Sequence, residues 1–308
     1  MGLTFGPVPS RRLGRSLGVN NIPPKFCTYS CIYCQIGITK GLTCERREFY
    51  KPEKIVESVK RELNKGEKID YVTFVPDGEP TLDINIGREI RAIKDAGARV
   101  AVITNASLLF HDDVREALSE ADWVSVKVDA GTERTWRKLN RPCRELEFKR
   151  VMDGILAFSR EYRNILCTET MLVQGYNEGE IKDIADFISE LKPAKAYISV
   201  PTRPPALSSV KKPDEESVNR AYNLLSRMVN DVELLTGYEG NDFSSSGKVE
   251  DDLLSITSVH PMREDAVAEL LKRHGRSWDL VESLLEKRLL KEVEYEGRKY
   301  YIRAFSKD

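Results

Sequence analysis

Short β-rich runs alternate with longer segments of helical apolar spacing through most of the chain, and this order restricts its possible folds. Strands separated by helices of this length predict parallel βαβ units in one sheet. Strands are expected at residues 71–75, 100–104, 123–128, 165–173 and 196–200, with a sixth at 17–19. Six such units can form an incomplete barrel of the α/β class, a partial (β/α)6 TIM-like fold with reactive groups at the carboxyl ends of the strands.

The segments between these strands have the apolar spacing and the end signals of amphipathic helices. Pro52 begins the first of them, where its missing N–H costs no hydrogen bond, and Gly66 ends it. Further helices are expected at residues 86–96, 112–121, 148–162, 178–191 and 214–235. Residues 1–26 are rich in Gly, Pro and Arg, and apart from the strand at 17–19 they predict an irregular arm.

The chain changes character after a break rich in Gly and Ser at residues 237–247. Two helices and then two strands are expected at residues 263–274, 277–287, 290–295 and 299–305. Glu296-Gly297 between the two strands is a hairpin turn signal. We therefore expect a partial-barrel domain over residues 1–243 and a small α+β winged-helix-like domain over residues 244–308.

The composition excludes several classes of protein. The chain has 308 residues, 41% of them hydrophobic and 31% charged, and a formal net charge of -1. These values exclude a disordered or collagen-like chain, a disulfide scaffold and a chain that is basic overall. No run of about 18 apolar residues could span a membrane, and no targeting signal is recognised. We therefore expect a cytoplasmic protein whose six cysteines form no disulfides.

Three cysteines stand close together: Cys27, Cys31 and Cys34 have the spacing C-x3-C-x2-C. Three thiolates this close can surround one metal centre, so a metal-binding site is expected here. A zinc site would take a fourth ligand, for which Cys44 or a distant His is the candidate. A closed iron–sulfur cluster would also use four thiolates, whereas three leave one iron open to an exogenous ligand.

This motif, with Tyr33 before its last cysteine, resembles the cluster motif of the radical S-adenosylmethionine (SAM) superfamily. Three further segments resemble that family, each at the end of a predicted strand. They are residues 77–80 (Asp-Gly-Glu-Pro), 103–105 (Ile-Thr-Asn) and 172–177 (Leu-Val-Gln-Gly-Tyr-Asn). The resemblance extends over about residues 10–240 and leaves the C-terminal segment outside it.

The resemblance implies a [4Fe–4S] cluster and SAM as cofactors. Cys27, Cys31 and Cys34 would hold the cluster, and one electron from it would split the sulfonium of SAM. The resulting 5′-deoxyadenosyl radical would take hydrogen from a substrate. By resemblance the cofactor-binding residues are Tyr33, Gly78, Glu79, Pro80, Asn105, Gln174 and Asn177. The chemistry also implies a low-potential electron donor such as flavodoxin or ferredoxin.

Lys127 lies in a predicted strand whose two faces differ. Valines at alternate positions over residues 124–128 share one face, so Lys127 shares the other with Asp129 and points into the barrel. A lysine there is unfavourable unless it is paired. It is expected either to contact the SAM carboxylate or an anionic substrate, or to form an ion pair with Asp129 or Glu169.

Several arginines could also bind anions. Arg203 stands between prolines after the last predicted barrel strand, where it could clamp a carboxylate or phosphate, or simply be a solvated side chain at a rigid exit. Arg11, Arg12 and Arg15 belong to a basic N-terminal segment. That segment could bind RNA or an acidic electron donor, or could be an ordinary solvated face.

Within the superfamily, the N-terminal half resembles the group related to the wyosine-base (tRNA) synthases. The shared phrases are residues 5–12, 77–82 and 126–130. That group has further cysteines before the SAM motif, whereas here none precedes Cys27. We expect a radical SAM enzyme with an unidentified substrate, for which tRNA is one candidate. The alternatives are modification of a peptide or protein docked by the C-terminal domain and, more distantly, a metal- or redox-sensing winged-helix DNA-binding protein.

Overall fold

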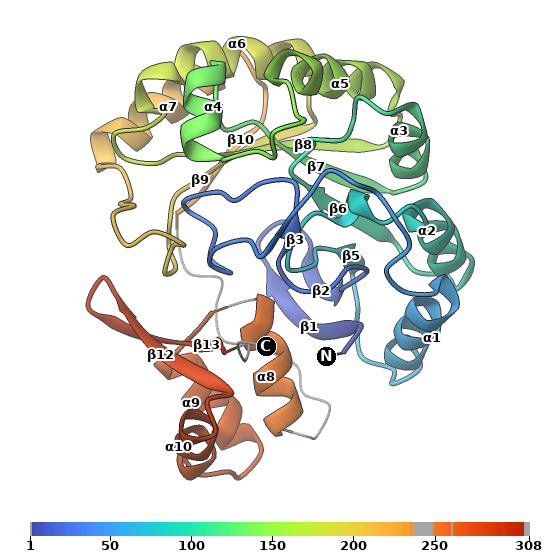
Figure 1. The fold of residues 1–308 in the computed structure, drawn as a ribbon, viewed down its shortest axis with the longest axis vertical. Coiled ribbons are helices and arrows are strands. Elements are labelled where there is room, and N and C mark those ends of the chain that lie inside the picture. The colour runs from blue at the N-terminus through green and yellow to red at the C-terminus, as the bar shows by residue number, and fades with distance from the viewer. Residues whose placement is uncertain (1, 237–248, 260, 305–308) are drawn as a thin grey trace.

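The computed structural model describes residues 2–236, 249–259 and 261–304. Its main feature is an eight-stranded sheet curled into a half-barrel, in the order β1-β2-β5-β6-β7-β8-β9-β10 (Figure 1). The strands are β1 (Thr4–Ser10), β2 (Gly14–Val19), β5 (Tyr71–Phe74), β6 (Val100–Thr104), β7 (Trp123–Lys127), β8 (Ile165–Met171), β9 (Lys195–Ser199) and β10 (Val232–Leu235). Neighbours from β2 to β10 are parallel, and β1 is antiparallel to β2. This is the predicted partial TIM-like barrel with one more strand at each edge.

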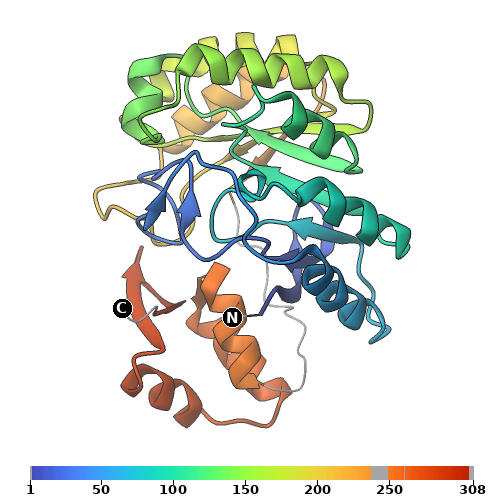
Figure 2. The same cartoon turned by 45° about the vertical axis from the view of Figure 1, so that its right-hand side comes forward.

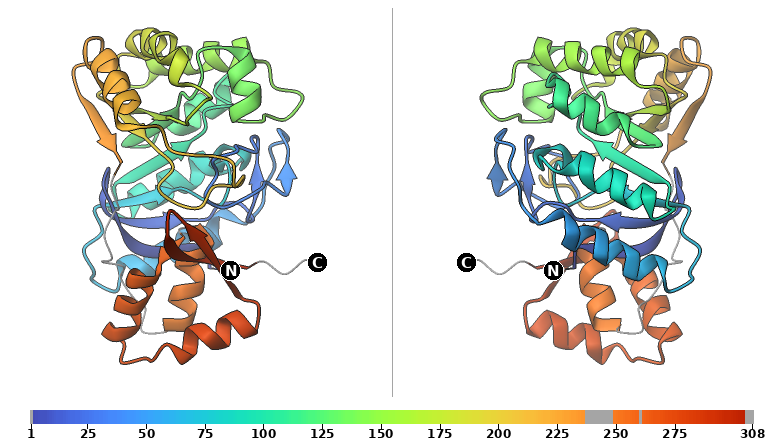
Figure 3. Two further views of the ribbon diagram at one scale, coloured as in Figure 1. Left: turned by 90° about the vertical axis from the view of Figure 1, so that its left-hand side faces the viewer. Right: turned by 90° about the vertical axis from the view of Figure 1, so that its right-hand side faces the viewer.

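Helices between the strands cover the convex face of the sheet (Figures 1 and 3). They are α1 (Pro52–Leu63), α2 (Ile86–Asp95), α3 (Asp112–Ser119), α4 (Glu133–Leu139), α5 (Phe148–Glu161), α6 (Ile181–Leu191) and α7 (Glu215–Ser226). Their apolar faces, with Ile55, Ile90 and Ile184, share one core with the outward side chains of the strands, such as Val124 and Val126. Among the described residues no helix is both long and apolar enough to cross a bilayer.

The concave face of the sheet is apolar where the strands begin and polar where they end. Tyr71, Ala101 and Trp123, at the first or second position of β5, β6 and β7, pack together on this inner face. Because side chains alternate along a strand, Ser125 and Lys127 share the inner face with Trp123. The predicted difference between the two faces of β7 is therefore present, and it places Lys127 at the carboxyl end of the strand.

The N-terminal segment differs from the irregular arm that was expected, because Thr4–Ser10 form β1. Phe5 is buried opposite Gly18 of β2, where an added Cβ would lie 2.0 Å from the Phe5 ring. Pro7 and Pro9 spoke against a strand here at the level of sequence, since proline has no backbone N–H to donate to a neighbouring strand. At a sheet edge such a donor is not needed on the outer side, so prolines are tolerated there.

The helix expected over residues 214–235 is wrong in its second half. α7 ends at Ser226, and Val232–Leu235 form β10 beside β9. Leu235 packs on the inner face of the sheet with Tyr197, so pairing with β9 and burial override the local helical spacing. The apolar spacing did not predict helix α4. Thr132 caps its start, and the Thr132 hydroxyl accepts a hydrogen bond from the backbone N–H of Thr135.

The C-terminal segment has an apolar core of its own. It consists of α8 (Val249–Val259), β11 (Met262–Arg263), α9 (Glu264–Arg273), α10 (Asp279–Glu286), β12 (Leu290–Tyr295) and β13 (Arg298–Arg303), with sheet order β11-β13-β12. Val8 of β1 packs against this core, so the segment lies at the β1 edge of the half-barrel (Figure 2). The two expected helices and the hairpin are present, while the winged-helix assignment stays a prediction. The expected boundary between residues 243 and 244 lies outside the described residues.

Candidate functional site

The three clustered cysteines lie on one loop inside the arc of the strands (Figure 1). Cys27 ends β3 (Phe26–Cys27), which pairs with β4 (Gly41–Leu42), so the two ends of the loop lie side by side. The backbone N–H of Cys34 donates to the carbonyl oxygen of Cys31 at 3.2 Å and tightens the turn between them. All three cysteines are half-buried and none is in a disulfide. The predicted ligands therefore share one short, folded segment.

The cysteine loop is fastened to the strand exits on one side and to α4 on the other. Phe26 forms a bridge with Gly78, where an added Cβ would lie 1.7 Å from the Phe26 carbonyl oxygen. Only glycine permits this approach. On the other side the backbone N–H of Ile32 donates to the carbonyl oxygen of Leu139 at the end of α4, at 3.0 Å. Packing against Phe26 is therefore enough to explain why the Asp-Gly-Glu-Pro segment has glycine at position 78.

Several N–H groups are directed at the cysteine sulfurs. The side-chain amide of Asn105 lies 3.5 Å from the sulfur of Cys27, and the amide of Asn140 lies 3.5 Å from the sulfur of Cys31. The backbone N–H of Tyr29 donates to Cys27 at 3.4 Å. Hydrogen bonds to sulfur stabilise thiolates and tune iron–sulfur clusters. The chemistry of these donors therefore fits a thiolate-bound cluster on this loop.

Burial raises the pKa of these thiols in the metal-free chain. For Cys31 the pKa is about 12, because burial acts together with the nearby Cys34 and Asp129. For Cys27 burial is the largest cause of a raised pKa, followed by the carboxylate of Glu79. Thiols of this kind are protonated at neutral pH, so a metal that binds them must displace protons.

Glu79 joins the ends of two strands. It is 1% exposed, and Oε1 accepts hydrogen bonds from the backbone N–H and the hydroxyl of Thr81 and from the hydroxyl of Thr104. Oε2 accepts the backbone N–H of Asn105 at 2.7 Å. Pro80 begins the short turn that carries Thr81. The carboxylate thereby ties the exit of β5 to the exit of β6.

Asn177 and Gln174, both in the segment at residues 172–177, have different surroundings. The amide of Asn177 donates to the carbonyl oxygens of Asp129 and Met171, both at 2.8 Å, and its Oδ1 accepts the backbone N–H of Val173. Asn177 is fully buried and joins the ends of β7 and β8. Gln174 is exposed, and its backbone N–H donates to Lys211 at 3.1 Å. The surroundings of Asn177 suit a brace between strands.

Asp77 is a buried carboxyl group that sequence reasoning did not single out. It is 2% exposed, and neither carboxylate oxygen has a hydrogen-bond partner among the described residues. Burial raises the pKa of Asp77 to about 8, and Lys25 opposes the rise. The sequence signal that could have identified Asp77 is its position in the Asp-Gly-Glu-Pro segment.

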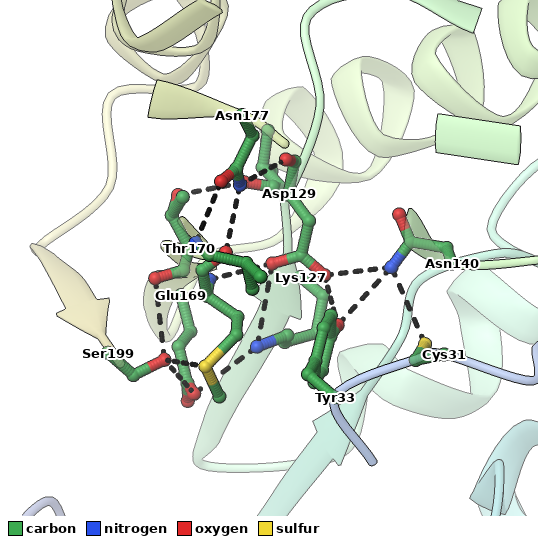
Figure 4. Close-up of polar contacts among 12 residues, drawn as sticks. Cys31, Tyr33, Lys127, Asp129, Asn140, Glu169, Thr170, Asn177 and Ser199 are labelled. Carbon is green, nitrogen blue, oxygen red and sulfur yellow. Dashed lines mark hydrogen bonds and ion pairs between the residues drawn. The ribbon is translucent and has the colours of Figure 1, made fainter. Parts of the chain in front are cut away.

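Lys127 forms the ion pairs that were one of its two expected arrangements (Figure 4). Its Nζ lies 3.3 Å from Oε1 of Glu169 and 3.6 Å from Oδ1 of Asp129. Burial would lower the pKa of Lys127, but Asp129 and Glu169 outweigh it and hold the pKa above its usual value. The ammonium is therefore charged and shared between two carboxylates.

Arg12 also pairs with Glu169, from the turn between β1 and β2. Burial alone would raise the pKa of Glu169, but Arg12 and Lys127 lower it to about 2. Arg15 pairs with Glu67 at 3.3 Å. Arg12 therefore belongs neither to a binding patch nor to a solvated face, the two alternatives for the basic segment, since its side chain is 17% exposed and turned inward. The reason is that β1 and β2 form a hairpin that carries the arginine to the inner face.

Asp129 connects this group to the cysteine loop. Its Oδ2 accepts hydrogen bonds from the hydroxyl of Tyr33 and, at 2.9 Å, from the amide of Asn140, which also points at Cys31 (Figure 4). The ammonium of Lys127 lies 5.3 Å from the centre of the Tyr33 ring. A continuous polar network, here called the lumen network, therefore runs from Arg12 through Glu169, Lys127, Asp129 and Asn140 to Cys31.

Arg203 contacts the cysteine loop. Its guanidinium donates to Oε1 of Gln35, next to Cys34, at 2.8 Å. The loop after β9 also approaches through Leu207, whose backbone N–H donates to the carbonyl oxygen of Ile32 at 3.0 Å. The segment after β9 thus closes over the cysteine loop, and Arg203 lies at the barrel mouth as expected.

The expectation that all six cysteines stay unpaired is wrong, because Cys44 and Cys143 form a disulfide. Their Cα atoms are 6.6 Å apart, although the residues are 99 positions apart in the sequence. The backbone explains the meeting, since the N–H of Cys143 donates to the carbonyl oxygen of Thr28 and Cys44 follows β4. Cys167 is free and buried on the inner face of the sheet. The local sequence carries no signal for the meeting of Cys44 and Cys143, because the two residues are far apart in the chain.

Reduction of the Cys44–Cys143 bond is expected to lower the thermal midpoint of the metal-free protein. The bond closes a long loop, and loss of such a link costs about 2–5 kcal/mol through the entropy of the unfolded chain. Thermal unfolding with and without dithiothreitol measures the effect, and Cys143→Ser should match the reduced protein. An unchanged midpoint in both cases would show that the bond does not form in solution.

Acid is expected to remove the stabilisation that Glu169 provides. Its folded pKa of about 2 lies below the ordinary value of 4.5, so the contribution is complete above pH 4.5 and is lost as the pH falls towards 2. The size is about 3 kcal/mol at 1.36 kcal/mol for each pH unit. Urea unfolding at several pH values measures it against Glu169→Gln. If the difference between the two proteins did not shrink in acid, the carboxylate would not be ion-paired.

Comparison with known proteins identifies relatives over most of the chain. The model of the Radical SAM superfamily matches residues 21–188. The UPF0026 protein MJ1312 of Methanocaldococcus jannaschii is 45% identical over 98% of this chain and 96% of its own length. The S-adenosyl-L-methionine-dependent tRNA 4-demethylwyosine synthase TYW1 of Xenopus laevis is 24% identical, over 60% of this chain and 27% of its own length.

A solved structure has the same fold. It is described as TYW1 with a lysine-pyruvate adduct bound, and it superposes with a TM-score of 0.52 at 18% identity. The match covers 70% of this chain and 74% of that one. At this identity the likeness concerns the half-barrel fold alone.

Proposed function

This chain belongs to the radical SAM superfamily and, within it, to the UPF0026 family, and we propose that it cleaves SAM reductively at a [4Fe–4S] cluster held by Cys27, Cys31 and Cys34. Radical SAM enzymes work with such a cluster and SAM, so these are the cofactors that family membership gives the chain. The resemblance noted in the four sequence segments is thereby confirmed at the level of the superfamily. Our proposals concern which residues are the cluster ligands and what the substrate is.

One observation carries the assignment of the cluster ligands. Cys27, Cys31 and Cys34 are the three free cysteines on one loop, and N–H groups of Asn105 and Asn140 are directed at two of their sulfurs. The fourth cysteine of a closed site would have to be Cys44, which is bonded to Cys143 instead. Three thiolates leave one coordination position for an exogenous ligand.

A cluster held by Cys27, Cys31 and Cys34 would supply the electron that splits SAM into methionine and a 5′-deoxyadenosyl radical able to remove hydrogen from a substrate. The chain's own residues orient the reactants and exclude water. Gly78 lets the strand exit approach the cysteine loop, and Glu79 and Asn105 hold the exits of β5 and β6 in place. We assign SAM contacts to this edge, including the turn at Pro80 and the ring of Tyr33.

We assign Lys127 a positioning role in this reaction. Its ammonium is shared by Asp129 and Glu169, and Asp129 holds the hydroxyl of Tyr33. A contact to the SAM carboxylate would have to use the third N–H of an ammonium that already has two carboxylate neighbours. Arg203 is proposed to order the cysteine loop through Gln35. Gln174 and Asn177 stay candidates for the adenine side, Gln174 by its exposure and Asn177 by bracing the strand exits.

The proposed reaction is tested by anaerobic reconstitution with iron, sulfide, dithionite and SAM, followed by measurement of 5′-deoxyadenosine. We expect 5′-deoxyadenosine from the wild-type chain, and we expect the matched variant Cys167→Ala to retain it, since that thiol packs on the inner face and touches no proposed ligand. A fully loaded protein that forms no 5′-deoxyadenosine would contradict the proposal. Flavodoxin or ferredoxin in place of dithionite identifies the class of electron donor.

A further inference from the structure

A large pocket lies between the end of the half-barrel and the C-terminal hairpin of β12 and β13. Its volume is about 620 Å³. Thr202, after β9, and Thr236, after β10, line one side, while Arg298 and Tyr300 of β13 line the other. Because β9 and β10 are parallel to the strands of the candidate site, this hairpin pocket opens at the same carboxyl edge of the sheet.

The two walls of the hairpin pocket are joined by direct bonds. The hydroxyl of Tyr300 donates to the carbonyl oxygen of Thr202 at 3.1 Å. The hydroxyl of Tyr295 donates to the carbonyl oxygen of Pro201 at 3.2 Å. Lys212, on the loop after β9, pairs with Glu296 at the hairpin turn at 3.0 Å. The pocket therefore has fixed walls, which reduces the cost of ordering it around a ligand.

The lining is rich in positive charge. Lys212, Arg263 and Arg298 contribute three cations, against the carboxylate of Glu296 in the lining and that of Asp265 beside it. Burial raises the pKa of Tyr300, whereas the charges of Arg263, Arg203 and Arg298 oppose the rise. Arg263 is also paired with Asp265 at 2.7 Å, which fixes its direction. Three cations against two carboxylates leave a net positive charge at the pocket, which favours an anionic ligand.

We propose that the hairpin pocket binds the phosphate of a nucleotide unit of the substrate, an inference that rests on the proposed function. Guanidinium groups match phosphate oxygens in pairs, and several of them around one site favour phosphate over a single carboxylate. A volume of this size is typical of pockets that hold more than a bare phosphate. The ligand's reactive part would then extend towards the cysteine loop, past Arg203, which donates to Gln35 on that loop and is close enough to Tyr300 to oppose the rise in its pKa.

Binding is measured on the full chain without reductant or SAM, using three probes: adenosine monophosphate, a fluorescent single-stranded RNA oligonucleotide and polyglutamate. We expect saturable binding of a phosphate probe. Arg298→Gln should weaken it about tenfold to a hundredfold, since a charge-assisted hydrogen bond is removed. The matched control is Lys149→Gln on α5, whose side chain is 86% exposed and far from the pocket in sequence and fold. It should bind like the wild type.

The probes distinguish the source of the phosphate. Binding of both the mononucleotide and the RNA supports a free nucleotide-sized ligand, and binding of the RNA alone supports a nucleotide within a polymer. Equal binding of polyglutamate would overturn the phosphate assignment. Equal loss in Arg298→Gln and Lys149→Gln would overturn the pocket as the site, because general surface charge would explain the affinity.

Failure of this inference can be separated from failure of the proposed function. Wild-type protein that forms 5′-deoxyadenosine but binds no phosphate probe would overturn the pocket assignment alone. Wild-type protein that binds the probes through Arg298 but forms no 5′-deoxyadenosine would overturn the proposed reaction alone. Thermal unfolding of Arg298→Gln is measured beside binding, and Arg298→Lys, which keeps the charge, should recover part of the affinity.

Discussion

Replacement of Cys27, Cys31 or Cys34 with alanine, one at a time, is expected to abolish both the cluster absorbance and the reductive cleavage of SAM. Each change removes one of three thiolates, and two thiolates do not hold a [4Fe–4S] cluster that needs three or four. The expected loss is complete, because no other cysteine stands ready to replace the missing ligand: Cys44 is bonded to Cys143. Iron and sulfide content, visible absorbance and 5′-deoxyadenosine yield measure the result.

Two further cysteine variants make this prediction specific. Cys167→Ala should leave iron content and SAM cleavage nearly unchanged. Cys44→Ala should keep the iron while lowering the thermal midpoint, because it breaks the disulfide. If Cys44→Ala lost the iron as completely as Cys34→Ala, the site would be a closed four-thiolate centre, and the argument for an open iron position would be wrong.

The sequence allowed much of the half-barrel to be predicted, because the signals for its parallel strands are local. Buried parallel strands are short and β-rich, and the six that were expected are all present. The two edge strands were missed for opposite reasons. The prolines of β1 argued against a strand, whereas the residues of β10 continue the apolar spacing of the preceding helix and were therefore assigned to it. Both strands depend on pairing with a neighbour, which the local sequence does not encode.

The candidate site was predictable in its residue types and less so in its contacts. The alternation of β7 placed Lys127 on the inner face, but it could not choose between an ion pair and a cofactor contact. The pairing of Arg12 with Glu169 joins residues 157 positions apart, so only the closed sheet brings them together. Asn140 gave no signal, since its role depends on the approach of α4 to the cysteine loop.

Replacement of Lys127 with methionine is expected to destabilise the protein by about 3–5 kcal/mol at pH 7, the usual cost of removing one member of a buried ion pair. Methionine has a similar length but no charge, so Asp129 and Glu169 would keep two negative charges against Arg12 alone. The side chains of Lys127 and Asp129 are 16% and 1% exposed, so water can compensate little. Urea unfolding of the metal-free protein measures the loss.

The matched control is Lys149→Met, which removes an exposed pair with Asp153 and should cost less than about 0.5 kcal/mol. The double variant Lys127→Met/Glu169→Gln should recover part of the lost stability, since it removes one of the stranded charges. The deficit of Lys127→Met should also shrink in acid, because a protonated Glu169 no longer needs its partner.

The same variant tests whether the lumen network positions the cysteine loop. Lys127 touches none of the three thiols, so iron content should stay near that of the wild type. Loss of its charge frees Asp129 and Tyr33, which hold Asn140 against Cys31, so the cluster spectrum or potential should shift while iron is retained. Lys127→Arg, which keeps the charge, should restore most of the stability and the spectrum. Unchanged stability together with a tenfold weaker SAM affinity would contradict this account, because the ammonium would then serve the SAM carboxylate instead of its two carboxylate neighbours.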